Sequence, residues 1–191
     1  VTKKDEGELV FLSFFYTMNT ILLTTQQMVW QIFDEICQIP RPSGKETQIM
    51  NYLREFALKH GFLTKTDKAG NIVMIRPGEA PAIALQAHTD MVCEKRNETT
   101  HDFEKDAIQT YTEDGWMKAK GTTLGADNGI GMAMALAAMV NYQGNRQLEG
   151  LFTVEEETGL TGAAAVESGF ITANTLLNLD SEDENELIVG C

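Results

Sequence analysis

The spacing of apolar residues predicts two amphipathic helices near the start of the regular part of the chain. Apolar side chains recur at helical spacing through Gln26–Gln38. This helix should end at Ile39-Pro40-Arg41-Pro42, because residues before proline are pushed out of the α region. Ser43-Gly44-Lys45-Glu46 fits a capping box for a second helix, which would end at Lys59-His60-Gly61. The apolar face of that helix would consist of Ile49, Tyr52, Leu53, Phe56 and Ala57.

Five later segments have the pattern of β-strands. Phe62–Thr66 and Asn71–Arg76 flank a turn and predict a hairpin. Pro81–Ala87 is a nearly continuous apolar run, as expected for a strand that is covered on both faces. Leu148–Val154 and Thr175–Leu179 are two more short apolar runs.

Helices are expected between these strands. Asn128–Val140 is rich in Ala and Met almost all round, which is typical of a buried helix. Gly162–Ser168 would form a short helix before the last strand. The alternation predicts an α/β fold with a mixed, mostly parallel central sheet that is flanked by helices.

Polar side chains follow three of the apolar strands. His88-Thr89-Asp90 follows the first, Glu155-Glu156-Glu157 the second and Asp180 the third. In open α/β sheets, ligands bind outside the carboxyl ends of the strands, where these groups should lie. Asp127 fits the same edge, because it stands among glycines at the start of the buried helix.

Several carboxylates and an imidazole at one edge would repel one another unless cations compensate them. One histidine with several acidic residues suits zinc or another divalent first-row metal. Each motif also has an ordinary interpretation: His-x-Asp by chance, a solvated glutamate triplet, a helix N-cap at Asp127 and a strand-end cap at Asp180. The joint placement is what favours a metal centre over these alternatives.

Composition limits the class of protein and its partners. The 191 residues are 43% hydrophobic and 23% charged, which is typical of one globular domain. The net charge of −13 makes nucleic acid and anionic membranes poor partners. Cys37, Cys93 and Cys191 form neither a disulfide framework nor a C-x-x-C zinc motif, which predicts a reducing, cytoplasmic compartment.

The first residues differ from the rest in pattern. The apolar run from Leu9 to Tyr16 lacks the basic flank and cleavage site of a secretory signal and is too short to span a bilayer. We therefore expect residues 1–17 to be a non-native or disordered extension outside the fold.

Several ordered motifs resemble the two-zinc exopeptidase superfamily, and in more detail the aminoacyl-histidine (Xaa-His, carnosine-splitting) dipeptidases. The resemblance covers roughly Thr24 to Cys191. Its motifs are Pro40-Arg41-Pro42-Ser43-Gly44, Gln86-Ala87-His88-Thr89-Asp90-Met91-Val92-Cys93, Gly121-Thr122-Thr123-Leu124-Gly125-Ala126-Asp127-Asn128-Gly129, Phe152–Leu160 and Asn178-Leu179-Asp180-Ser181-Glu182.

The resemblance implies a site for two Zn²⁺ ions, with Co²⁺ or Mn²⁺ as possible substitutes. His88 and Asp180 would bind one ion, Asp127 would bridge, and Glu157 would bind the other. Asp90 would orient His88, and Glu156 would be the general base that activates a water between the ions. The resemblance also implies a cis bond between Asp127 and Asn128, and no direct role for Glu155.

The implied activity is metal-dependent hydrolysis of small dipeptides with C-terminal histidine. Family members also use a second histidine and a lid domain that forms a homodimer, and this sequence supplies neither, since His60 and His101 do not match the second position. Residues 18–191 are thus expected to be the N-terminal part of a catalytic domain that is inactive alone. A tripeptidase, an N-acyl-amino-acid hydrolase and a catalytically silent fragment remain alternatives.

Overall fold

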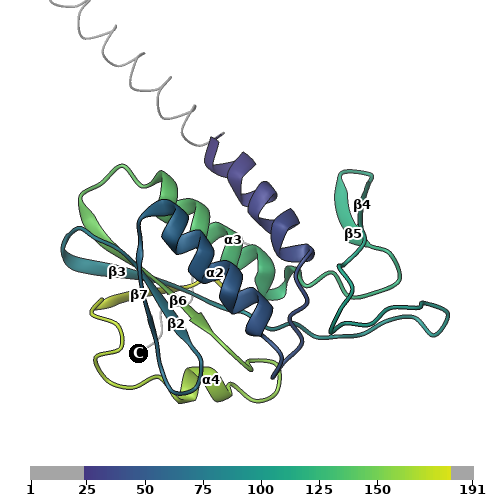
Figure 1. Ribbon diagram of the computed structural model, residues 1–191. Helices are drawn as coiled ribbons and strands as arrows, with labels where there is room; N and C mark the ends of the chain where they lie inside the picture. The colour runs from purple at the N-terminus through teal and green to yellow at the C-terminus, as the bar shows by residue number, and fades with distance from the viewer. Residues whose placement is uncertain (1–23, 182–191) are drawn as a thin grey trace, which may run out of the picture.

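Three helices lie together against a five-stranded sheet in the computed structural model, which describes residues 24–181 (Figure 1). The prediction for residues 1–17 lies outside the described residues. Residues 24–37 are helical, and the remaining helices are α2 (Thr47–His60), α3 (Ala126–Asn141) and α4 (Thr161–Ala164). The strands are β1 (Leu63–Thr66), β2 (Ile72–Arg76), β3 (Glu79–His88), β4 (Thr110–Glu113), β5 (Trp116–Ala119), β6 (Arg146–Thr153) and β7 (Thr175–Asn178).

The large sheet has the strand order β1-β2-β6-β3-β7. β3 pairs in parallel with both β6 and β7, whereas β2 runs antiparallel to β1 and β6. Four of the five strands therefore point the same way, as the sequence predicts. The carboxyl ends of β3, β6 and β7 lie side by side at one rim of the sheet.

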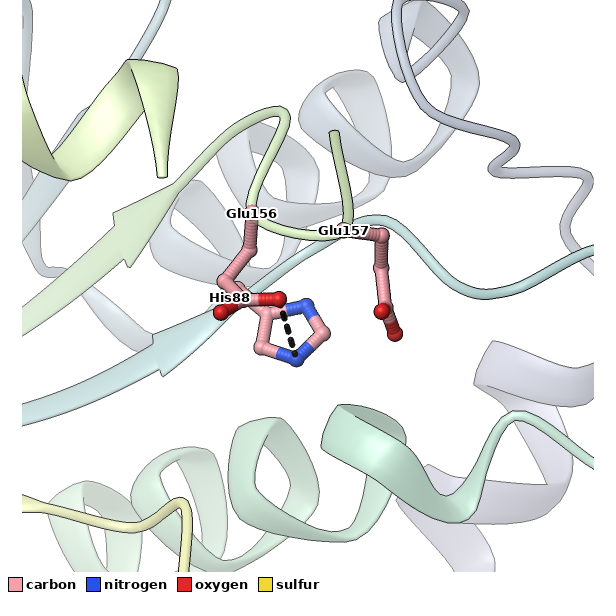
Figure 2. A group of neighbouring side chains, drawn as sticks. All are labelled: His88, Glu156 and Glu157. Carbon is pink, nitrogen blue, oxygen red and sulfur yellow. Dashed lines mark ion pairs between the residues drawn. The ribbon is translucent and has the colours of Figure 1, made fainter. Parts of the chain in front are cut away.

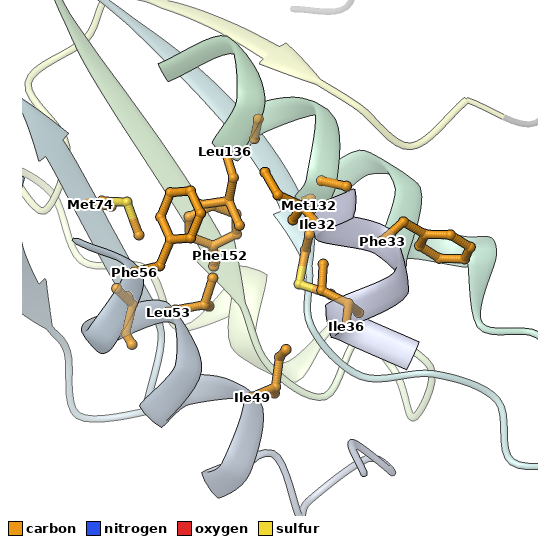
Figure 3. Close-up of a cluster of buried hydrophobic side chains, with 14 of the residues drawn as sticks. Ile32, Phe33, Ile36, Ile49, Leu53, Phe56, Met74, Met132, Leu136 and Phe152 are labelled. Atoms are coloured by element: carbon orange, nitrogen blue, oxygen red, sulfur yellow. The ribbon is translucent and has the colours of Figure 1, made fainter. Parts of the chain in front are cut away.

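The core lies between the helices and the sheet (Figure 3). The helix of residues 24–37, α2 and α3 each present buried apolar side chains, and the central strands meet them with large side chains. The labelled members are Ile32, Phe33, Ile36, Ile49, Leu53, Phe56, Met74, Met132, Leu136 and Phe152. Because the core fixes the helices on the sheet, it also fixes the start of α3 beside the strand ends.

The predicted capping box of α2 is wrong. The helix begins at Thr47 without a side-chain cap. Ser43 Oγ instead donates to Asp90 Oδ2 at 2.6 Å, and Glu46 Oε1 accepts a hydrogen bond from the Glu155 amide at 3.0 Å. Both side chains thus contact segments that are distant in sequence.

A two-stranded sheet of β4 and β5 stands away from the main sheet and was not predicted (Figure 1). Asp114 and Gly115 form its turn with φ values of 51° and 79°. α4 is shorter than the predicted helix over Gly162–Ser168. Within residues 24–181, no helix is long and apolar enough to cross a membrane.

Candidate metal centre

His88 is the last residue of β3, and its buried ring faces several carboxylates at the rim. Nε2 of His88 lies 2.9 Å from Asp127 Oδ1. It also lies 3.9 Å from Glu156 Oε2 and 3.9 Å from Asp180 Oδ2. The rim therefore unites side chains from the ends of three strands and from the start of α3, as the sequence predicts.

The start of α3 is held against the end of β7. Asn128 Nδ2 donates to the Leu179 carbonyl at 3.2 Å. Gly131 lets this carbonyl approach, since a Cβ at Gly131 would lie 2.6 Å from the Leu179 oxygen. These contacts place Asp127 and Asp180 beside the same imidazole. The Asp127-Asn128 bond is cis, as the resemblance implies.

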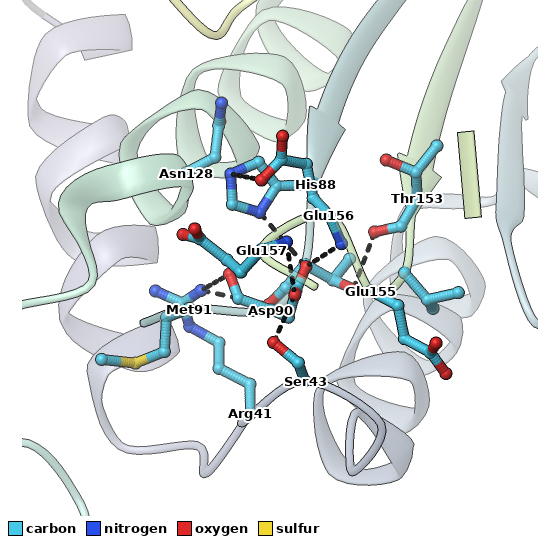
Figure 4. Close-up of polar contacts among 12 residues, drawn as sticks. Arg41, Ser43, His88, Asp90, Met91, Asn128, Thr153, Glu155, Glu156 and Glu157 are labelled. Carbon is cyan, nitrogen blue, oxygen red and sulfur yellow. Dashed lines mark hydrogen bonds and ion pairs between the residues drawn. The ribbon is translucent and has the colours of Figure 1, made fainter. Parts of the chain in front are cut away.

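Asp90 is fully buried beneath His88. It connects the ring to the loop of Glu155, Glu156 and Glu157, here called the glutamate loop (Figure 4). Its Oδ1 lies 3.3 Å from His88 Nδ1, an ion-pair contact that does not meet hydrogen-bond geometry. The Glu156 and Glu157 amides donate to its two oxygens at 3.0 and 3.1 Å. A carboxylate at this position favours the proton on Nδ1 and leaves Nε2 to bind a metal.

The loop that carries Glu156 and Glu157 is held at its beginning. Asn71 Oδ1 accepts a hydrogen bond from the Val154 amide at 3.1 Å, and Glu46 accepts one from the Glu155 amide. Glu155 adopts a left-handed backbone conformation, with φ of 51°. This turn follows β6 directly and directs the next two amides toward Asp90.

The electrostatics of the site favour a bound cation. Burial lowers the pKa of His88, but the ion-pair contact with Asp90 and the hydrogen bond to Asp127 outweigh this effect and raise the pKa to about 9. Burial and the Asp127 charge raise the pKa of Glu157. Burial would also raise the pKa of Asp90, but the ion-pair contact with His88 and hydrogen bonds from Ser43 and two amides hold the pKa well below its ordinary range.

Glu157 provides the most direct test of whether the residues suit a metal. Its Oε1 is buried and has no hydrogen-bond partner in the part of the chain that the structure describes. A buried carboxylate oxygen without a donor is costly unless a cation occupies the adjacent space. The donor set of one imidazole and several carboxylates suits Zn²⁺ and similar divalent ions.

Two overlapping groups of side chains have ligand atoms within 4.8 Å of one another. One consists of His88, Glu156 and Glu157 (Figure 2), and the other of His88, Asp127 and Asp180. The structure thus brings together all six residues that were predicted for the site, including Asp90. Glu156, the predicted general base, belongs to the first of these groups.

The other histidines lie away from this centre. The His60 ring lies 4.5 Å from Phe56 by ring centroids, and His101 packs edge-on against Phe103. Arg41, Glu46 and Asn71 also contact the site, although they were not predicted as site residues. For Arg41 a signal existed, because it lies in a motif that the resemblance includes.

Comparison with known proteins decides the family. Residues 84–188 match the profile of Peptidase family M20/M25/M40. The chain belongs to this family. The match covers the end of β3, the start of α3 and the glutamate loop, which carry the site.

Two relatives share 44% sequence identity with the chain. One is the cytosol non-specific dipeptidase of Escherichia coli (strain K12), over 91% of this chain and 37% of the relative. The other is the crystal structure of aminoacylhistidine dipeptidase from Vibrio alginolyticus, with a TM-score of 0.77, over 82% of this chain and 33% of that one. A tripeptidase structure from Staphylococcus aureus is 26% identical, with a TM-score of 0.68, over 81% of this chain and 43% of that one. The chain therefore spans well under half the length of these relatives.

Proposed function

We propose that this rim is the divalent-metal centre of a cytoplasmic dipeptidase whose substrates include peptides with C-terminal histidine. The observation that carries the proposal is the convergence of His88 with Asp127, Asp180, Glu156 and Glu157. Residues from four separate segments meet at one imidazole, and family membership supports a peptidase role.

His88, Asp127, Asp180 and Glu157 would hold the metal. We propose that these four residues would hold a pair of zinc ions. Bound divalent ions would polarise the scissile carbonyl and lower the pKa of the attacking water. Asp90 would keep the His88 ring in place and leave Nε2 available as a ligand.

Glu156 would act as the general base rather than as a ligand. Its amide donates to Asp90, and its carboxylate lies 3.9 Å from His88 Nε2, the atom that also faces Asp127 and Asp180. From there, the carboxylate can accept a proton from the attacking water and deliver it to the departing amine.

The dipeptide specificity rests on the relatives. The two relatives at 44% identity are named as dipeptidases, one non-specific and one for aminoacylhistidine. The tripeptidase is more distant at 26% identity but shares the fold, so tripeptide hydrolysis is the second candidate.

Glutamine substitutions distinguish a glutamate that binds the metal from one that acts as the general base. Glu157→Gln should weaken metal binding by roughly 10-fold or more, because an amide is a much poorer ligand than a carboxylate. Glu156→Gln should leave metal content nearly unchanged. Titration with Zn²⁺ and elemental analysis would measure both, and a large loss of metal in Glu156→Gln would reassign this residue as a ligand.

Hydrolysis is best tested in a chimera in which residues 24–181 replace the matching segment of the Escherichia coli relative. We expect the chimera to hydrolyse β-alanyl-histidine and other dipeptides, and Glu156→Gln to lower kcat by at least about 100-fold. Faster cleavage of tripeptides than of any dipeptide would favour the second candidate instead.

A further inference from the structure

Arg41 is a buried cation beneath the candidate metal centre, on the segment that joins the helical residues 24–37 to α2. It is 2% exposed. Nη1 donates to the Thr89 carbonyl at 3.1 Å and to the Asp90 carbonyl at 2.8 Å, and Nη2 donates to the Gly125 carbonyl. No hydrogen bond to a carboxylate is found for Arg41 among residues 24–181.

The three carbonyls belong to two different segments of the site. Thr89 and Asp90 follow β3 and adjoin His88, whereas Gly125 lies two residues before Asp127. The guanidinium fork therefore spans the gap between the segment that supplies the imidazole and the segment that supplies Asp127.

The packing around the fork leaves little room for a different arrangement. A Cβ at Gly125 would lie 2.5 Å from Arg41 Nη2, and one at Gly129 would lie 2.8 Å from the same atom. Burying a charge is costly, so a guanidinium whose hydrogen bonds here all go to backbone carbonyls indicates a demand for its planar, multi-donor geometry. A lysine ammonium cannot reach both segments in the same way.

Ser43, two residues further on, acts on the same site. Its Oγ donates to Asp90 Oδ2 at 2.6 Å. The other oxygen of Asp90 faces His88 Nδ1. The hydroxyl thus opposes rotation of the carboxylate that orients the imidazole.

We infer that Arg41 and Ser43 are positioning residues of the metal centre: Arg41 fixes the distance between the His88–Asp90 segment and Asp127, and Ser43 fixes the Asp90 carboxylate. This inference rests on the proposed function. It assigns a role to the Pro40-Arg41-Pro42-Ser43-Gly44 motif, which supplies no candidate ligand.

The test uses Co²⁺ as the probe, because its visible absorption reports coordination geometry as well as affinity. Arg41→Lys should bind Co²⁺ roughly 10-fold or more weakly than the unchanged chain, with an altered spectrum. The matched control is Arg76→Lys, since Arg76 Nη2 also donates to a backbone carbonyl, that of Tyr142, away from the site. Circular dichroism would confirm that each variant is folded.

Ser43→Ala is the second variant, because the loss of one half-buried hydroxyl does not threaten the fold. We expect its Co²⁺ affinity to fall roughly 3- to 10-fold, and Ser43→Thr, which keeps the hydroxyl, to recover most of the loss. Ser168→Ala, at an exposed position, should match the unchanged chain. If Arg41→Lys does not fold, the Ser43 variants decide the question.

The outcomes separate the inference from the proposed function. If the unchanged chain binds Co²⁺ and the folded variants bind it within about twofold with the same spectrum, Arg41 and Ser43 serve only stability and the inference is wrong. If the unchanged chain binds no Co²⁺, the metal centre itself is wrong, and the inference fails with it.

Discussion

His88 is the residue at which the two candidate ligand groups overlap. Its Nε2 faces Asp127, Glu156 and Asp180, while Nδ1 faces Asp90. These carboxylates raise the pKa of the ring to about 9, and a metal that bound Nε2 would compete with a proton there. One side chain therefore links proton release to metal uptake.

Removal of this imidazole should affect metal binding more than removal of any other histidine. We expect His88→Ala to lose about one equivalent of bound zinc, measured by elemental analysis after dialysis. His101→Ala is the matched control, since His101 contacts Phe103 instead of the site. If His88→Ala retained all of its zinc, His88 would not be a metal ligand.

Gly131 determines how closely α3 approaches the end of β7. A Cβ there would lie 1.7 Å from Asn128 Oδ1 and 2.6 Å from the Leu179 carbonyl oxygen. Gly131→Ala should therefore lower the free energy of unfolding by about 1–3 kcal/mol, as overpacking does, despite the higher helix propensity of alanine.

Chemical denaturation would measure this change, and metal titration should show weaker binding as Asp180 moves away from Asp127. Met134→Ala on an exposed part of the same helix is the comparison, with an expected change within about 0.5 kcal/mol. An increase in stability for Gly131→Ala would contradict the described packing.

At the scale of elements, β6 carries a buried acid that connects it to the chain before β7. Glu149 accepts hydrogen bonds from the Thr172 amide at 2.8 Å and the Ala173 amide at 3.2 Å, and also from Gln147 and the Thr172 hydroxyl. Burial would raise its pKa, but these donors outweigh burial and lower it. The carboxylate thus fixes where β7 begins.

This shift predicts a pH dependence of stability. Because the folded-state pKa of Glu149 lies below the ordinary value of 4.5, its contribution is present above pH 4.5 and is lost as the pH falls through the folded-state pKa. Glu149→Gln should cost about 1–3 kcal/mol at pH 7 and less at low pH.

Urea denaturation from pH 7 downward would measure the effect. Glu79→Gln is the control, because Glu79 is exposed and accepts a single side-chain hydrogen bond, from Asn145. Equal losses for Glu149→Gln at all pH values would show that the charge of Glu149 does not contribute.

The strongly periodic elements could be predicted from the sequence, and those that depend on distant contacts could not. The helical spacing in α2 and the apolar run in β3 arise locally, so both were found. The capping-box prediction failed because Ser43 and Glu46 have stronger partners elsewhere in the fold. The β4–β5 hairpin was missed although Asp114-Gly115 is a recognised turn signal between strand-forming residues.

The candidate site was predictable at the level of residue types and strand ends. The sequence indicated which side chains should reach one rim, because parallel strands place their carboxyl ends together. It could not reveal that Arg41 is buried, since an arginine between two prolines is ordinarily exposed. The hydrogen bonds that bury Arg41 reach carbonyls of Asp90 and Gly125, which lie 49 and 84 residues away along the chain.

At the scale of the whole molecule, β7 leaves apolar surface uncovered. Among residues 24–181 it pairs on one side only, with β3, and Leu176 and Leu177 are each 45% exposed. Unpaired strand edges with apolar side chains promote association. The net charge of −13 makes copies of the chain repel one another and so opposes association, and salt screens this repulsion.

We therefore expect the chain to self-associate increasingly as salt concentration rises. Leu177→Glu should reduce this association, because an added charge at a strand edge disfavours pairing. Light scattering after gel filtration at low and high salt would measure the change, with Leu58→Glu on α2 as the control at another exposed leucine. Equal association of the two variants would show that the chain does not associate through the β7 edge.

β6 runs toward the candidate site, so its amino end lies away from the site. The strand runs from Arg146 to Thr153, and the glutamate loop follows its carboxyl end. At about 3.3 Å per residue, the strand itself spans roughly 23 Å, and the exposed Gln143 precedes the end that lies away from the imidazole. A fluorophore attached there would lie at a useful distance for energy transfer to Co²⁺, so metal occupancy could be followed optically without altering any residue at the rim.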